Sequence, residues 1–231
     1  MKHVFLLFAF AFITLEANSQ SFRIGVKGGA NYADISGKDL DKNAHNYKLS
    51  WHAGAMLNIQ YPGNTWFSIQ PELIYSRKGY ESSSLPFTIS DNQGNPIYEA
   101  ERSGYVNLNY LDLPVMFNFK SGIIVFEFGP QFSYLVGYRN DAVFIQTLGD
   151  GTIITSEDGD RRFSENRLNK FDVGLATGFR LETQNGVGLG LRFNQGFIKL
   201  DNGEPRLLNA PRAPIGSNQV FQLFVSYLLP R

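Results

Sequence analysis

The chain has no cysteine and only three histidines, and these shortages exclude much of the chemistry that proteins perform. Without cysteine there is no disulfide bond, no thiolate metal site and no cysteine nucleophile. An excess of one charge sign is lacking too, because 21 Lys and Arg residues balance 21 Asp and Glu residues. A balanced charge gives no general attraction to nucleic acid. We therefore predict no nucleic-acid partner.

Long hydrophobic runs are also lacking. The apolar run at 4–15 has 12 residues, whereas a helix that spans a bilayer needs about 20. Lys2 and His3 precede this run, and the small-residue pattern Ala17-Asn18-Ser19 follows it. These three parts are typical of a secretory signal peptide. We predict a signal peptide at 1–19 and one mature domain at 20–231.

Aromatic residues, glycine and strict alternation are abundant. The chain has 20 Phe, 11 Tyr and 23 Gly, and every odd position over 49–61 is apolar. Most even positions there are polar or glycine, which is the pattern of a strand with two chemically different faces. The same pattern predicts eight strands, at 22–33, 48–61, 65–78, 105–119, 123–138, 170–182, 187–196 and 219–229.

The connections between these strands alternate strictly in length. Three are tight turns, at 62–64, 120–122 and 184–186. Four are long, at 34–47, 79–104, 139–169 and 197–218. In an up-and-down meander this alternation brings all long loops to one end, as in transmembrane barrels. We predict an all-β fold: an eight-stranded antiparallel up-and-down transmembrane β-barrel with four long loops at one end and three tight turns at the other.

The polar face of the strands decides between a membrane barrel and a soluble one such as a lipocalin. This face is rich in glycine, which suits the crowded interior of an eight-stranded barrel. Its ionisable residues also balance by sign, as buried charges must. We predict a structural charge network in the lumen, formed by Arg23, Lys27, Glu72, Glu127, Asp172, Arg180, Glu182 and Arg192. Aromatic residues near the strand ends are expected to form girdles at the membrane surfaces, namely Tyr61, Trp66, Phe67, Tyr138 and Tyr227.

A few positions disturb the strand pattern. Proline removes a ladder hydrogen bond, and three prolines fall within predicted strands: Pro71, Pro114 and Pro130. The alternation of the fourth strand also shifts at 109–111. We expect local bulges or interrupted pairing at these places.

Six stretches, in order along the chain, are similar to the PorT-like outer-membrane β-barrel family. They are FRIGVKGGAN at 22–31, QPELIYSRKG at 70–79, YLDLP at 110–114, FGPQ at 128–131, FDVG at 171–174 and LRFNQG at 191–196. The resemblance implies a barrel in the outer membrane, and one branch of the family is linked to a protein-secretion apparatus. It supplies no catalytic motif.

Few residues are available for catalysis. Only His45 and His52 follow the predicted signal peptide, and hydrolytic enzymes commonly need a histidine base. The segment Asp158-Gly159-Asp160 lacks the full ligand set of a calcium loop, so we predict no metal and no cofactor. We predict a non-enzymatic structural or interaction component of the cell envelope. Its partners would be outer-membrane lipid and, through the long loops, envelope or secretion-complex proteins.

Three other functions stay open from the sequence. A charged lumen also suits a narrow channel or small-solute transporter. His45 with a loop serine and aspartate would suit a lipid-active outer-membrane enzyme. With its faces reversed, the same barrel would be a soluble periplasmic lipocalin-like carrier.

Overall fold

The computed structural model describes residues 21–37, 45–82, 87–90, 93, 96–141, 143–148, 150–157, 168–201 and 216–230. The predicted signal peptide lies outside the described residues, as does the segment 158–160. The strands are β1 (Ser21–Ser36), β2 (His45–Asn46), β3 (Lys48–Gln60), β4 (Phe67–Ser82), β5 (Phe87–Ser90), β6 (Pro96–Ser121), β7 (Ile124–Asn140), β8 (Val143–Leu148), β9 (Ile153–Glu157), β10 (Phe171–Glu182), β11 (Val187–Gly196) and β12 (Ser217–Leu228).

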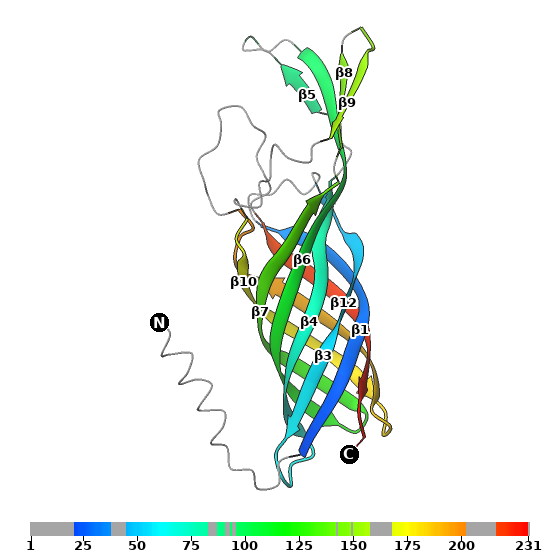
Figure 1. Ribbon diagram of the computed structural model, residues 1–231, viewed down its shortest axis with the longest axis vertical. Helices are drawn as coiled ribbons and strands as arrows, with labels where there is room; N and C mark the ends of the chain where they lie inside the picture. Colours follow the sequence, from blue (N-terminus) through cyan, green and yellow to red (C-terminus); the bar gives the residue numbers. More distant parts are fainter. Residues whose placement is uncertain are drawn as a thin grey trace, which may run out of the picture.

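Eight of these strands close into a barrel (Figure 1). Every pairing is antiparallel, in the order β1, β12, β11, β10, β7, β6, β4 and β3, and β3 pairs with β1 to complete the ring. The predicted all-β, eight-stranded up-and-down fold is confirmed. Among the described residues, no helix is both long and apolar enough to cross a bilayer.

The three tight connections lie at one end of the barrel, which we call the turn end; the opposite end is the loop end (Figure 1). In the β3–β4 connection the Asn64 side chain accepts hydrogen bonds from the backbone N–H groups of Trp66 and Phe67. Gly122 and Gly186 adopt positive φ angles of 60° and 85° in the other two turns. Only glycine takes this conformation at little cost, so the sequence fixes where these turns fall.

Three segments predicted as long loops contain strands, which corrects the expectation for 34–47, where β2 lies, and for 79–104 and 139–169. β6 runs 26 residues, well past the barrel, and its outer part pairs with β5 on one side and β8 on the other. β9 pairs with β8, so β5, β6, β8 and β9 form a small sheet beyond the loop end (Figure 1). We call it the extension sheet. Short β-branched runs such as Ile153-Ile154-Thr155 favour strands. They are too short, however, to be told from loop sequence by alternation.

The outer face of the barrel is apolar and the inner face is polar. Large hydrophobic side chains are exposed along every barrel strand, for example Ile24 at 61%, Leu49 at 74% and Leu223 at 51%. Their inward neighbours include Lys27, Glu72 and Arg192, each less than 5% exposed. A soluble carrier would need the opposite arrangement, so the faces match a barrel that sits in lipid.

The irregular positions behave in two different ways. Beside Pro71, Pro114 and Pro130 the ladders skip some residue pairs and resume in the same register, so pairing is interrupted without a bulge. At Asn109 and Tyr110 the register shifts against β7, which accommodates Val136 as an extra residue. This shift turns Tyr138 inward, where it packs on buried residues. The prediction of Tyr138 in an outer aromatic girdle was therefore wrong.

Candidate functional site

The lumen near the middle of the barrel is organised around Arg192. Its guanidinium donates to both carboxylate oxygens of Glu72, at 2.7 and 2.9 Å, and to Glu127 at 2.8 Å. Lys27 adds a second cation to Glu72 at 3.0 Å. All four side chains are at most 2% exposed. Charges buried this deeply persist because each one has a hydrogen-bonded counter-charge.

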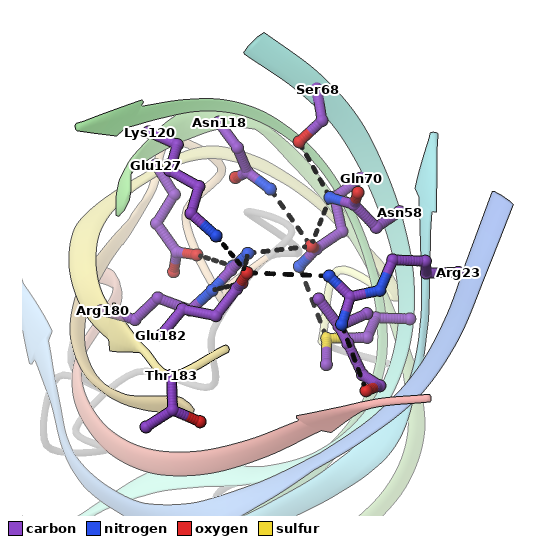
Figure 2. A network of polar contacts seen from close by, with 12 residues as sticks. Arg23, Asn58, Ser68, Gln70, Asn118, Lys120, Glu127, Arg180, Glu182 and Thr183 are labelled. Carbon is purple, nitrogen blue, oxygen red and sulfur yellow. Dashed lines mark hydrogen bonds and ion pairs between the residues drawn. The ribbon is translucent and has the colours of Figure 1, made fainter. Parts of the chain in front are cut away.

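A second group of charges lies closer to the turn end (Figure 2). Arg180 links the two groups, with Glu127 at 2.9 Å and Glu182 at 3.0 Å. Glu182 also accepts from Lys120 at 2.8 Å and lies 3.7 Å from Arg23. Arg23 additionally donates to the backbone carbonyls of Leu228 and Leu229 near the end of the chain. One carboxylate thus sits among three cations at the mouth of the barrel.

Gln70 connects the charges to neutral amides. Its carbonyl oxygen accepts from Asn58 and Asn118, each at 3.1 Å, and from Arg180 at 3.3 Å. Its amide nitrogen donates to Glu72 at 2.8 Å. Gln70 is fully buried, so a nonpolar residue here would leave several buried polar groups without a partner, at about 1–3 kcal/mol each.

Seven of the eight predicted lumen residues share this connected network, and Asp172 lies apart from it. Asp172 is near the loop end, where its carboxylate accepts from the Asn218 side chain at 3.1 Å and from the backbone N–H of Ile198 at 3.2 Å. Those partners are neutral, whereas the sequence suggested a balancing cation. The structural role of the network as a whole remains our proposal.

Sequence reasoning missed several lumen residues, above all the pair Lys78 and Asp112. Lys78 donates to Asp112 at 2.8 Å, and both side chains are at most 3% exposed. The alternation that points Glu72 inward also points Lys78 inward, six residues further along β4. The signal was therefore present in the sequence. Lys120 was missed because it lies at the edge of a tight turn.

Glycine makes room for these large side chains. A Cβ at Gly190 would lie 2.5 Å from the ring of Phe224 and 2.7 Å from the Cβ of Arg180. The Phe224 ring in turn lies 4.0 Å from the ammonium of Lys27, a cation–π contact. Because Gly190 has no side chain, Arg180 and Phe224 can both pack against its backbone.

The loop-end part of the lumen is filled by apolar side chains, which we call the apolar cluster. Its members come from β1, β4, β6, β7 and the segments that flank β10 and β11: Ile35, Tyr80, Val106, Leu108, Tyr110, Leu135, Leu168 and Leu200. The Tyr110 hydroxyl accepts from Asn218 at 3.2 Å. Each member is at most 4% exposed, so the barrel is filled at both levels.

The two histidines do not form a catalytic set. His52 bonds Asn31 at 2.7 Å within the lumen. His45 bonds Asp34 at 2.9 Å, and it pairs across β2 and β4 with Ser82. The free ring nitrogen of His45 and the hydroxyl of Ser82 each lack a hydrogen-bond partner, so the serine–histidine link of a triad is not made. No cluster of metal-ligating residues occurs in the described part of the chain.

An open recess of about 380 Å³ lies at the turn end. It is lined by charged residues of the network, by the amides Asn58, Gln60 and Gln184, and by Trp66 at the β3–β4 turn. Its lining thus combines charged groups with amides.

A family model places this architecture among known proteins. Residues 18–202 match the model described as outer membrane protein beta-barrel domain. The chain belongs to this family. The protein is accordingly an outer-membrane β-barrel in contact with membrane lipid.

Several solved outer-membrane proteins are similar in structure. Neisserial surface protein A (NspA) is 12% identical, with 91% of this chain and 99% of that chain covered and a TM-score of 0.44. OprG from Pseudomonas aeruginosa is 10% identical, covers 92% and 98%, and has a TM-score of 0.38. Ail, the attachment invasion locus protein of Yersinia pestis, is 9% identical, covers 91% and 98%, and has a TM-score of 0.35. No curated protein matches the chain.

Proposed function

We propose that the protein is a non-enzymatic outer-membrane barrel that acts as a structural and interaction component of the cell envelope. The observation that carries this proposal is the contrast between a filled lumen and a long extension sheet. The charge network and the apolar cluster leave little space for a solute to pass. β6 meanwhile continues beyond the barrel and, with β5, β8 and β9, presents a surface at the loop end.

The extension sheet has features of a contact surface. Within the part of the chain that the structure describes, β9 pairs on one side only, with β8, and Ile153 is 66% exposed. An exposed strand edge with β-branched side chains is a template for pairing with another chain. The sheet therefore supports a partner that presents extended backbone or an apolar patch.

The resemblance to the PorT-like family supplies a sharper version of this proposal. In that version the barrel is an accessory of a protein-secretion complex, and the loop-end surface contacts the other components. The incomplete His45 arrangement supports a role without catalysis.

Site-specific photocrosslinking in intact cells tests the proposal. A photoreactive residue at Ile153 or Thr155 on β9 should give discrete protein adducts, because these positions lie at the free strand edge. The matched control is the same residue at Ile24, on the lipid-facing side of β1. Protein adducts at Ile24 and none at Ile153 or Thr155 would contradict the proposed surface.

A further inference from the structure

The recess at the turn end carries more positive than negative charge. The connected network contains five cations, Arg23, Lys27, Lys120, Arg180 and Arg192, but only three carboxylates, Glu72, Glu127 and Glu182. Two positive charges are therefore in excess within one set of linked side chains. Lys78 and Asp112 form a separate, neutral pair and do not change this balance.

The remaining lumen carboxylate is too far away to compensate. Asp172 stands ten residues before Glu182 on the same strand, which corresponds to roughly 33 Å at about 3.3 Å per residue. Deeper in the barrel two cations balance two carboxylates, so the excess positive charge lies at the mouth. Glu72 has Lys27 and Arg192, and Glu127 has Arg180 and Arg192.

At the mouth itself, Glu182 is shared by Arg23, Lys120 and Arg180 (Figure 2). Arg23 is held only loosely to this carboxylate, at 3.7 Å, and its other contacts are neutral carbonyls. Lys120 is 38% exposed and Arg23 16% exposed, so both can reach a group that enters the recess. Partly desolvated cations with one shared counter-charge attract an additional anion.

The uncharged residues that line the recess indicate the chemistry of the rest of the ligand. Asn58, Gln60 and Gln184 carry amide groups, which both donate and accept hydrogen bonds. Trp66 also borders the recess, while its ring packs on the outward-facing Phe67 and Phe119. Amides, which both donate and accept, suit a ligand rich in hydroxyl groups.

We propose that the turn-end recess binds a saccharide that carries a phosphate or carboxylate group. Arg23 and Lys120 contact the anionic group, and the amides contact the sugar. The turn end of bacterial barrels faces the periplasm, so the ligand is either a free saccharide there or the hydroxyl-bearing anionic headgroup of a lipid in the adjacent leaflet, for which phosphatidylglycerol serves as the probe. The site is independent of the contact surface on the extension sheet.

Isothermal titration calorimetry on the folded barrel tests this site, in a detergent without sugar, phosphate or net charge. The probes are glucose 6-phosphate, inorganic phosphate and uncharged glucose. We expect saturable binding of glucose 6-phosphate, at least tenfold tighter than that of glucose. The variants Arg23→Gln and Lys120→Gln should each weaken the binding tenfold or more. Retarded or accelerated migration on an unboiled gel, relative to the boiled sample, verifies that each variant is folded.

The control variant is Arg139→Gln, because Arg139 is exposed at the loop end, far from the recess, and pairs with its neighbour Asp141. It should bind glucose 6-phosphate as the wild type does. The absence of saturable binding of both glucose 6-phosphate and phosphate would overturn the proposal, as would unchanged affinity in folded Arg23→Gln and Lys120→Gln.

A second titration distinguishes the two sources of the ligand. Binding of glucose 6-phosphate is compared in nanodiscs of phosphatidylcholine and of phosphatidylglycerol. Binding that is lost only with phosphatidylglycerol supports the site and assigns it to a lipid headgroup. Equal binding in both supports the site and assigns it to a free saccharide.

Discussion

The charge network and the apolar cluster fill the lumen in two chemically different ways. The stability of the charge network depends more strictly on the exact positions of its groups. At the turn end and the middle, Arg180 and Arg192 hold three carboxylates within 3.0 Å. At the loop end, the apolar cluster fills the same barrel with side chains that need no counter-charge. Charged filling requires each group to meet its counter-charge, whereas apolar filling requires only volume.

The largest effect should follow from removing the central cation. Arg192→Met keeps much of the side-chain volume but leaves Glu72 and Glu127 with one cation each. Breaking a buried ion pair on one side costs about 3–5 kcal/mol. Urea unfolding of the barrel in lipid vesicles measures this loss of stability. A loss below about 1 kcal/mol would mean that the network does not hold the barrel together.

Removing a side chain from the apolar cluster should destabilise the barrel by nearly as much. The cause is lost volume and not a lost ion pair. Leu108→Ala removes a side chain that is 1% exposed and should cost about 2–5 kcal/mol through lost contacts and a cavity. The same unfolding assay measures it. Leu108→Met, which nearly conserves volume, is the control and should cost less than about 1.5 kcal/mol. Equal losses in Leu108→Ala and Leu108→Met would show that volume is not what this region requires.

The outer face gives a third comparison, because both regions of the lumen share one lipid-facing surface. Leu223 is 51% exposed near the centre of β12, and Leu223→Arg should cost about 2–4 kcal/mol at the bilayer midplane. Leu229→Arg, beyond the end of the strand, should cost only about 0–1 kcal/mol. The two variants are compared by their unfolding free energies and their assembly into outer membranes. Equal tolerance of both would mean that the faces are reversed.

The smallest effect is expected at the mouth. Lys120 is 38% exposed, and exposed ion pairs contribute about 0–1 kcal/mol. Lys120→Gln should therefore leave the stability of the barrel almost unchanged in the urea assay. A loss as large as that of Arg192→Met would show that the mouth belongs to the core of the network.

Much of this architecture can be predicted from the sequence, because alternation fixes which face each strand residue occupies. Alternation even places apolar residues correctly: it predicts that Val125, Leu135 and Phe224 point inward, and all three are buried. Glu72 and Arg192 meet from β4 and β11, which lie on different parts of the ring. Alternation places both side chains in the lumen, but it does not give the register that joins them.

The remaining features depend on interactions that a single strand does not encode. The extra residue Val136 shifts the register and turns Tyr138 inward, which alternation within β7 alone does not predict. The extension sheet forms because β6 continues far enough to pair with β5 and β8. Asp172 finds Asn218 and the backbone of Ile198 because the ends of three strands meet there.

Planar-bilayer recording tests the central claim, a lumen filled at both levels, most directly. Purified folded protein is reconstituted and recorded in KCl over a range of voltages, with a known open barrel as the positive control for insertion. A filled lumen predicts no reproducible conductance steps at any voltage that the bilayer tolerates. Discrete, reproducible steps from the wild-type protein would contradict the account and favour a channel.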